Sequence, residues 1–429
     1  MIAVAPGPAP AMSRRSQVVA AFSTVVEWYD FTLYLYLATV LSRVFFGGGG
    51  SSLGAALGGF AVAYLMRPLG AAVFGHVGDR YGRRRTMLLS MALMTGAMLA
   101  TALLPTYARI GPAAGWLLLL LRCVMAFSVG GEYTGVVAYL LEGARQDRRG
   151  LVTSSAAAAS EVGGLLAAGV AAITVGALGS RDLDAWGWRV PFLIGSALAA
   201  CVWLARSTMD ESPDFVRQQA GGTVPPSPLR HALTDHRTGI ARGFAISALG
   251  SITYYVGITY VPAFLASTGG MSEAGALWLS TAAALVVILV TPLTGALSDR
   301  IGRRPVLIGV CGCAAVLPVA MFALMAGGTH RWALGGALVL AAVGGAVSAV
   351  GAVATAEQFP GEGRLTGLAL GVTTATAIFG GLAPYVAHLL VERTGWPIVP
   401  GAMIAVVALG TLPVLVRMAE TRPVRVEMP

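Results

Sequence analysis

The sequence predicts an all-α integral membrane protein with twelve transmembrane helices in two pseudo-symmetric six-helix bundles. Of the 429 residues, 56% are hydrophobic and only 11% are charged, whereas an average soluble domain has about 25% charged residues. Long apolar segments recur along the chain, arginines gather in alternate intervals between them, and one loop motif occurs twice. This composition excludes a disordered chain, a disulfide scaffold and an ordinary soluble enzyme.

Each predicted span is an apolar stretch close to the roughly 20 residues that a helix needs to cross the hydrocarbon core. The stretches are 17–42, 52–77, 87–105, 114–141, 150–177, 188–206, 239–267, 274–297, 305–326, 332–356, 364–391 and 396–417. The longest polar interval, 207–238, separates the first six from the last six. We therefore expect a disordered cytoplasmic N-terminus (1–16), an amino-terminal bundle (17–206), a cytoplasmic linker loop (207–238), a carboxy-terminal bundle (239–417) and a short cytoplasmic tail (418–429).

The distribution of arginine predicts the orientation in the membrane. All 29 basic residues are arginines; 21 lie in intervals that face one side, 6 lie in intervals that face the other, and Arg67 and Arg122 lie within spans. Because cytoplasmic loops of membrane proteins are enriched in basic residues, both termini are expected in the cytoplasm. We predict a multi-pass protein of the plasma (inner) membrane, whose positive net charge reflects this topology and not a nucleic-acid partner.

Two features of the first half recur in the second. The segment Gly75–Arg84 is repeated as Gly295–Arg304, 220 residues later. In addition, an acid precedes an arginine by seven residues in both halves, as Glu142 with Arg149 and Glu357 with Arg364. Parallel repeats of this kind belong to transporters whose binding site lies between the halves.

The repeated loop, G-x-x-x-D-R-x-G-R-R, resembles the signature of the major facilitator superfamily. Further segments resemble the metabolite:proton symporter family within it: Glu27–Tyr34, Arg67–Gly70, Gly130–Tyr133, Trp188–Phe192, Glu211–Phe215, Glu357–Pro360 and Phe379–Gly381. The resemblance implies the fold of that superfamily and transport by alternating access. The chain departs from the family pattern at Thr373-Thr374, where a Tyr-Asn pair is expected, and at Glu161, where relatives often have glutamine.

Six charged side chains lie within the predicted spans and away from their ends, all of them in the first half: Glu27, Asp30, Arg67, Arg122, Glu132 and Glu161. A charge in the hydrocarbon region is costly and usually functional. If each of the two arginines pairs with one carboxylate, two acids remain, and an unpaired buried acid can bind and release a proton near neutral pH. We therefore predict that proton coupling involves Glu27, Asp30, Glu132 and Glu161, with the proton as coupling ion and no other cofactor.

Among these acids, Glu27 and Asp30 are the strongest candidates. Their spacing of three residues places both on one face of a helix, where two like charges repel each other. An alternative remains for Glu132 and Glu161, either of which could be a structural partner of Arg122 or of a neighbouring backbone group.

The two intramembrane arginines are candidates for binding a carboxylate of the substrate, because the planar guanidinium binds two oxygens at once. Arg67 also has a structural interpretation, since Arg67–Gly70 resembles a family-wide element. Neutral contacts to the substrate are predicted from Tyr34, Tyr254, Tyr255, Tyr260 and Thr373.

The loops predicted to be cytoplasmic carry a set of charged residues that we call the latch residues. They are Asp79, Arg80, Arg83, Arg84, Glu142, Arg149, Asp299, Arg300, Arg303, Arg304, Glu357 and Arg364. The family resemblance implies that they form ion pairs and helix-end contacts that close the cytoplasmic side. Exposed ion pairs contribute about 0–1 kcal/mol each, which suits a contact that must open. The alternative is that these arginines only set the topology.

The sequence therefore favours a monomeric secondary active transporter that carries a small carboxylate-bearing metabolite, an organic acid or a betaine-like compound, together with protons. The alternative is a proton-driven antiporter that exports a drug or secondary metabolite, although Ser160–Gly169 lacks the proline usual in the fifth helix of such antiporters. We do not expect an enzyme or a metal site, because the sequence shows no His/Asp cluster at one interface and the four cysteines lack ligand-like spacing.

Overall fold

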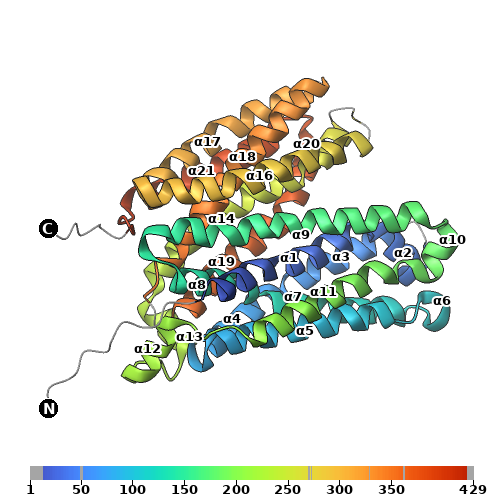
Figure 1. Cartoon of the computed structure of the whole chain (residues 1–429). Helices are drawn as coiled ribbons and strands as arrows, with labels where there is room; N and C mark the ends of the chain where they lie inside the picture. The colour runs from blue at the N-terminus through green and yellow to red at the C-terminus, as the bar shows by residue number, and fades with distance from the viewer. Residues whose placement is uncertain are drawn as a thin grey trace, which may run out of the picture.

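The computed structural model describes residues 13–48, 52–268, 271, 273–327, 329–360 and 363–422. Regular structure in these residues is entirely helical, which confirms the predicted all-α class. Helix α1 begins and α21 ends at one end of the molecule, where α12 and α13 also lie; we call this the linker end (Figure 1). Residues 1–12 of the predicted N-terminus and residues 423–429 of the predicted tail lie outside the described residues.

The first half contains the helices that precede the linker. They are α1 (Arg14–Tyr36), α2 (Ala38–Phe46), α3 (Ser52–Tyr64), α4 (Met66–Tyr81), α5 (Arg83–Leu103), α6 (Tyr107–Ile110), α7 (Ala113–Val129), α8 (Glu132–Gly143), α9 (Arg149–Ala177), α10 (Ser180–Asp182) and α11 (Arg189–Ser207). A 3₁₀ turn, η1 (Gln146–Arg148), precedes α9, and a π-helical turn, η2 (Leu183–Gly187), precedes α11.

The second half follows the linker. Its elements are α14 (Arg237–Tyr254), η3 (Tyr255–Thr259), α15 (Val261–Ser267), α16 (Glu273–Ile301), α17 (Arg303–Ala326), α18 (His330–Ala356), α19 (Arg364–Thr376), η4 (Ala377–Gly381), α20 (Ala383–Thr394) and α21 (Val399–Arg417). The turns η3 and η4 are π-helical, and each lies between two α-helices, η3 between α14 and α15 and η4 between α19 and α20.

Nine helical stretches among the described residues are long and apolar enough to cross a membrane. They are Arg83–Leu103, Ala113–Gly143, Gln146–Ala177, Arg189–Ser207, Thr281–Ile301, Arg303–Ala326, His330–Ala356, Arg364–Thr394 and Val399–Arg417. The remaining predicted spans, 17–42, 52–77 and 239–267, are each divided into consecutive helical elements: α1 with α2, α3 with α4, and α14 with η3 and α15. The twelve crossings and the orientation of the termini stay predictions.

The linker is more ordered than an irregular loop, because it contains two short helices, α12 (Pro213–Gly221) and α13 (Pro228–Asp235). The Ser212 hydroxyl caps α12 by accepting the backbone N–H of Phe215 at 3.2 Å, and Pro213 occupies the first turn. A serine cap followed by proline is a common start of a helix.

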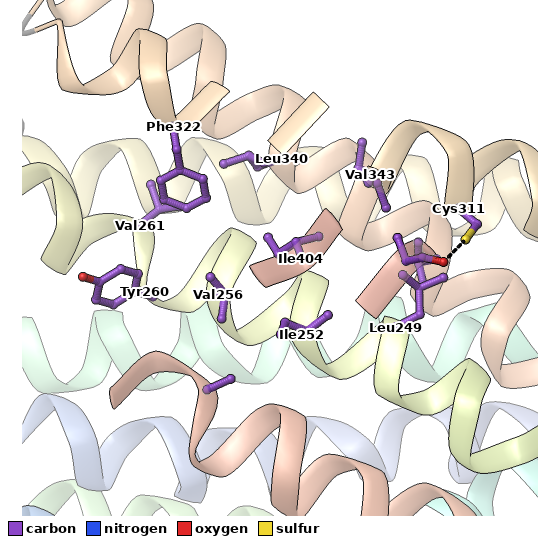
Figure 2. Packing of buried hydrophobic residues seen from close by; sticks show 14 of the residues in the cluster. Leu249, Ile252, Val256, Tyr260, Val261, Cys311, Phe322, Leu340, Val343 and Ile404 are labelled. Carbon is purple, nitrogen blue, oxygen red and sulfur yellow. Dashed lines mark hydrogen bonds between the residues drawn. The ribbon is translucent and has the colours of Figure 1, made fainter. Parts of the chain in front are cut away.

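Each half has its own apolar core. In the second half, Leu249, Ile252 and Val256 of α14 and η3 lie against Ile404 of α21 (Figure 2). The buried Cys311 thiol donates to the Ala408 carbonyl at 3.2 Å, so this cysteine serves as a small core residue. A third cluster, which includes Val137, Val353 and Leu365, contains residues of both halves and so joins them.

Glycines allow the two halves to approach closely. Helices α9 and α16 lie side by side (Figure 1). A Cβ on Gly150 would lie 2.4 Å from the Gly295 carbonyl oxygen, and a Cβ on Gly295 would lie 2.5 Å from the Gly150 carbonyl oxygen. Small residues that bring backbones together are the usual basis of helix contacts in membranes.

The same packing inside the first half gives a test of the structure. A Cβ on Gly163 of α9 would lie 2.3 Å from the Val25 carbonyl oxygen of α1. We expect Gly163→Ala to lower the free energy of unfolding by about 1–3 kcal/mol, as overpacking usually does. Thermal unfolding of the purified protein in detergent measures this effect.

Gly169, two turns later on the same helix, is the matched control because nothing lies within 4 Å of its added Cβ. Gly169→Ala is expected to be neutral or to stabilise the helix by up to about 1 kcal/mol. Equal stability of the Gly163→Ala variant and the wild type would contradict the contact between α1 and α9.

Candidate functional site

A cavity lies between the two halves. Its lining comes from α1, α4, α7, α8 and α9 in the first half and from α14, η3, α16, α18 and α19 in the second, and its volume is about 160 Å³. The charged side chains of its lining are Glu27, Arg67 and Glu161. A site at the interface of the halves is where a parallel repeat places a substrate.

Asp30 of α1 forms a two-point ion pair with Arg122 of α7. The Arg122 Nη1 donates to Asp30 Oδ2 at 2.7 Å, and Nη2 donates to Asp30 Oδ1 at 3.2 Å. Both side chains are buried. The pair lies outside the main cavity and lines a smaller pocket of about 30 Å³ that Glu27 and Arg67 also border. Each charge is therefore neutralised by its partner within the first half.

Glu132 of α8 is paired with Arg206, the penultimate residue of α11, and both are buried. The Arg206 guanidinium donates to both oxygens of Glu132 and to the Met87 carbonyl at 2.6 Å. The Ser90 hydroxyl also donates to Glu132. Sequence reasoning assigned Arg206 to the cytoplasmic intervals, because it lies at the very end of a predicted span.

Glu27 and Glu161 are the intramembrane acids that have no ion-pair partner within 4 Å in the described part of the chain. Glu27 is 3% exposed, and its buried Oε2 has no hydrogen-bond partner there. Glu161 of α9 accepts a hydrogen bond from the hydroxyl of Tyr254 of α14 at 2.6 Å. This hydrogen bond connects the two halves.

The sequence predicted that Arg67 and Arg122 would each bind one acid. In the described part of the chain Arg67 has no ion pair and Arg206 binds Glu132 instead. The two acids left over are Glu27 and Glu161, both in the cavity lining.

Arg67 lies between aromatic rings at the edge of the cavity. Its guanidinium carbon is 4.2 Å from the centre of the Tyr64 ring and 5.1 Å from that of Phe31. Nη1 donates to the Tyr64 hydroxyl at 3.3 Å. The described residues contain no carboxylate within 4 Å of this guanidinium, and its Nε is buried without a partner among them. Arg67 is thus a cation of the lining whose charge is available to an anion.

Aromatic contacts join the halves beside these charges. The hydroxyl of Tyr64 of α3 lies 2.5 Å from the hydroxyl of Tyr255 of η3, and the two are hydrogen-bonded. Trp28 of α1 meets Tyr254 edge to face, with ring centres 5.3 Å apart. The π-helical turn η3 begins directly after Tyr254, and Tyr254 and Tyr255 both line the cavity. π-helical turns are frequent at functional sites.

The other residues predicted to contact substrate separate into two groups. Thr373 lines the cavity together with the two tyrosines. Tyr34 and Tyr260 lie outside this cavity: the Tyr34 hydroxyl donates to the Ala56 carbonyl at 2.8 Å within the first half, and the Tyr260 ring lies in the core of the second half. A buried phenol needs an acceptor, and Tyr34 finds one in the neighbouring helix.

At the linker end, each repeated aspartate contacts the start of a helix in the opposite half. Asp79 accepts the backbone N–H of Leu365 at 3.2 Å and that of Thr366 at 2.8 Å, at the start of α19. Asp299 accepts the N–H of Gly150 at 2.8 Å and that of Leu151 at 2.9 Å, at the start of α9. A carboxylate at a helix N-terminus satisfies free N–H groups and is favoured by the helix dipole.

Arginines complete these contacts. Arg83 pairs with Asp79 at 3.1 Å and with Glu142 at 3.2 Å. In the second half, Arg303 pairs with Asp299 at 2.7 Å and with Glu357 at 3.2 Å. The acids among the latch residues therefore all have an arginine partner.

The two sides of the latch differ at their second arginine. Arg364 pairs across the halves with Glu142 at 2.9 Å and also with Asp214 of α12 at 2.8 Å. Arg149, at the equivalent position, has no ion pair within 4 Å among the described residues. The other predicted latch arginines make no such pair there either: Arg80 and Arg84 donate to backbone carbonyls, Arg304 donates to the Val416 carbonyl at 2.5 Å, and Arg300 is exposed.

Two acids of the linker end act as helix caps that sequence reasoning missed. Glu211 Oε1 accepts the N–H groups of Arg83 at 2.9 Å and Arg84 at 3.2 Å, at the start of α5. Glu420 accepts the N–H groups of Arg303 at 2.8 Å and Arg304 at 3.0 Å, at the start of α17. A short repeat carried this signal: Met-x-Glu-Ser/Thr occurs at 209–212 and at 418–421.

The contact between Asp214 and Arg364 keeps its charge at neutral pH. Burial opposes ionisation of Asp214, but the charges and hydrogen bonds of Arg364 and Arg217 outweigh it and lower the pKa of Asp214 below its usual 3.8. A lowered pKa means that the stabilisation is present above the usual value and is lost only as pH falls through the lowered one. Between about pH 5 and 8 this contact does not change its charge.

Comparison with known proteins agrees with this architecture. Residues 16–222 match the family model "Sugar (and other) transporter", and residues 243–427 match that of the "Major Facilitator Superfamily". The alpha-ketoglutarate permease of Escherichia coli (strain K12) is 34% identical over 373 residues, covering 86% of this chain and 85% of that protein. The proline/betaine transporter of Salmonella typhimurium is 31% identical over 425 residues, covering 96% of this chain and 85% of that protein.

The fold is also that of a solved structure. The proton:xylose symporter XylE, bound to 6-bromo-6-deoxy-D-glucose, superimposes with a TM-score of 0.79 at 20% identity, covering 95% of this chain and 96% of that one. The matching family models and these relatives agree with the repeated halves and the cavity between them. The chain belongs to the major facilitator superfamily, within its metabolite:proton symporter family. It is a membrane transporter of small molecules, not an enzyme.

Proposed function

We propose that this chain is a proton-coupled symporter that imports a small carboxylate-bearing metabolite by alternating access, as a monomer in the plasma (inner) membrane. Both termini, and therefore the linker end, would face the cytoplasm. The observation that carries the proposal is Glu27, a buried acid without an ion-pair partner among the described residues, in the lining of the cavity between the halves.

Glu27 is placed to couple proton movement to substrate movement. An isolated buried carboxylate is costly, and taking up a proton removes that cost. When the cavity opens to one side, Glu27 can exchange its proton with that side. Asp30 and Glu132 have bound arginines instead, and we assign them to fixed charge pairs.

Arg67 is the side chain that we assign to the carboxylate of the substrate. It lines the cavity and has no carboxylate within 4 Å in the described part of the chain. Both terminal nitrogens of Arg122, by contrast, are occupied by Asp30. Guanidinium groups bind carboxylates through two parallel hydrogen bonds, which fixes the orientation of the bound molecule.

The contacts between the halves support alternating access. At the linker end, Asp79 and Asp299 connect the halves, and the pair of Tyr64 and Tyr255 connects them beside the cavity. The conformation is therefore closed at the linker end. Opening to that side would break both aspartate contacts together.

The first prediction concerns Glu27. In proteoliposomes with an imposed pH gradient, Glu27→Gln is expected to lose gradient-driven accumulation while retaining exchange of substrate across the membrane, because glutamine cannot give up a proton. The matched control is Asp182→Asn, an exposed acid of α10. Accumulation by the Glu27→Gln variant at the wild-type level would contradict the proposal.

The second prediction separates a structural from a coupling role for Asp30. Asp30→Asn leaves Arg122 buried without a countercharge and is expected to lower the stability by about 3–5 kcal/mol. The double variant Asp30→Asn/Arg122→Gln removes both charges and should recover most of this loss. Thermal unfolding in detergent measures both variants. An Asp30→Asn protein that is fully stable but no longer proton-driven would show that Asp30 carries the proton, as the sequence predicts.

The third prediction concerns closure. Hydrogen bonds to a charged group contribute about 1.5–3 kcal/mol each, so Asp79→Asn should raise the population open at the linker end by about tenfold or more. The readout is labelling of Thr355→Cys, a buried cavity position, in a cysteine-free background. An impermeant maleimide is applied from the linker-end side.

The control for this experiment is Asp147→Asn, whose carboxylate is paired with the exposed Arg145. It should leave the labelling rate unchanged. An unchanged rate in the Asp79→Asn variant as well would mean that the contact between Asp79 and α19 does not control access.

A further inference from the structure

We infer that the substrate is a zwitterion, with one carboxylate and one ammonium group, and that Glu161 binds its cationic group. This inference rests on the proposed function, because it names the class of substrate for the same cavity. It is carried by the charges of the lining and by the hydrogen bond between Glu161 and Tyr254.

The charges of the cavity do not suit a molecule with several carboxylates. The lining contains two acids, Glu27 and Glu161, and one cation, Arg67. If both acids carry a proton, Arg67 is the one remaining charge of the described lining. It can pair with one carboxylate of a substrate, and a second or third carboxylate has no countercharge. A buried charge without a partner is costly, so dicarboxylates and tricarboxylates are disfavoured.

A zwitterion balances the same charges. Its carboxylate pairs with Arg67, and its ammonium group pairs with an ionised Glu161, while Glu27 carries the transported proton. The cavity and its contents then sum to zero charge. A simple monocarboxylate reaches the same balance only with a proton on Glu161 as well as on Glu27, whereas the cationic group of a zwitterion gives an ionised Glu161 a partner.

The surroundings of the two acids differ in a way that assigns these roles. Glu161 accepts the Tyr254 hydroxyl at 2.6 Å, which fixes the direction of its carboxyl group, and no second hydrogen bond to it occurs within the described residues. Its other oxygen is therefore available to a ligand. Glu27 receives no such donor, and its Oε2 is buried without a partner among those residues.

Aromatic side chains give the cationic group a second source of binding. Trp28, Tyr133, Tyr254 and Tyr255 line the cavity, and Tyr254 also holds Glu161. Aromatic rings attract ammonium groups, including quaternary ones that donate no hydrogen bond. A carboxylate among such rings therefore accepts an amino acid or a betaine.

The test uses pairs of compounds that differ at one atom. Glycine betaine is compared with 3,3-dimethylbutanoate, in which carbon replaces the charged nitrogen, and proline is compared with cyclopentanecarboxylate. Alpha-ketoglutarate and citrate represent the multiply charged anions. Equilibrium binding to the detergent-solubilised protein is measured first, and uptake into proteoliposomes follows with and without a pH gradient.

The wild type is expected to bind at least one zwitterion about thirtyfold or more tightly than the analogue in which carbon replaces the charged nitrogen. The reason is that loss of one partner from a buried charge pair costs about 2–5 kcal/mol. Glu161→Gln should abolish this discrimination, and Glu161→Asp, which keeps the charge, should retain part of it. A merely structural role of Glu161 would weaken both members of each pair equally.

Three results overturn the inference: tighter binding of alpha-ketoglutarate or citrate than of both zwitterions, failure of both zwitterions to bind, or undiminished discrimination in the Glu161→Gln variant. The proposed function fails in a different way. If zwitterions bind selectively but their uptake is the same with and without the pH gradient, proton coupling is refuted and the substrate class stands.

Discussion

The arrangement of this molecule depends on the partners of its buried charges, because lipid supplies neither water nor counter-ions. Asp30 with Arg122 and Glu132 with Arg206 form two closed pairs inside the first half. These pairs leave Glu27, Glu161 and Arg67 for the cavity between the halves. The chemistry of the cavity is therefore determined by which charges are already satisfied elsewhere, and the coupling and recognition roles that we propose follow from what remains.

Closure at the linker end relies on a second electrostatic device, the attraction between a carboxylate and the N-terminus of a helix. Asp79 binds the start of α19, and Asp299 binds the start of α9, so each half closes onto the other in the same way. The symmetry ends at Arg364, which also pairs with Asp214 of the linker helix α12. The linker thus supports one of the two contacts, the one at α19.

Much of this could be predicted from the sequence. Apolar segments, the repeated loop and the pairs of Asp79 with Arg83 and Asp299 with Arg303 are local patterns. The resemblance of single motifs was sufficient to indicate the family that the relatives then showed. The count of two unpaired acids rested on a wrong premise, because Arg67 has no ion pair within the described residues and Arg206, which was not counted, binds Glu132. Arg206 was missed because its position at the end of a span made it look cytoplasmic, and Glu211 and Glu420 were missed because a four-residue repeat is a weak signal.

The sequence by itself determined the helical class, the apolar segments and the excess of acids over arginines inside them, because hydropathy and charge are properties of each residue and its near neighbours. Only the tertiary structure decided which arginine reaches which acid, that Tyr34 lies in a core while Tyr254 and Tyr255 line the cavity, and that Glu161 meets Tyr254 across the halves. These contacts join residues far apart in the chain, so they depend on how helices rotate and pack, which no local pattern specifies.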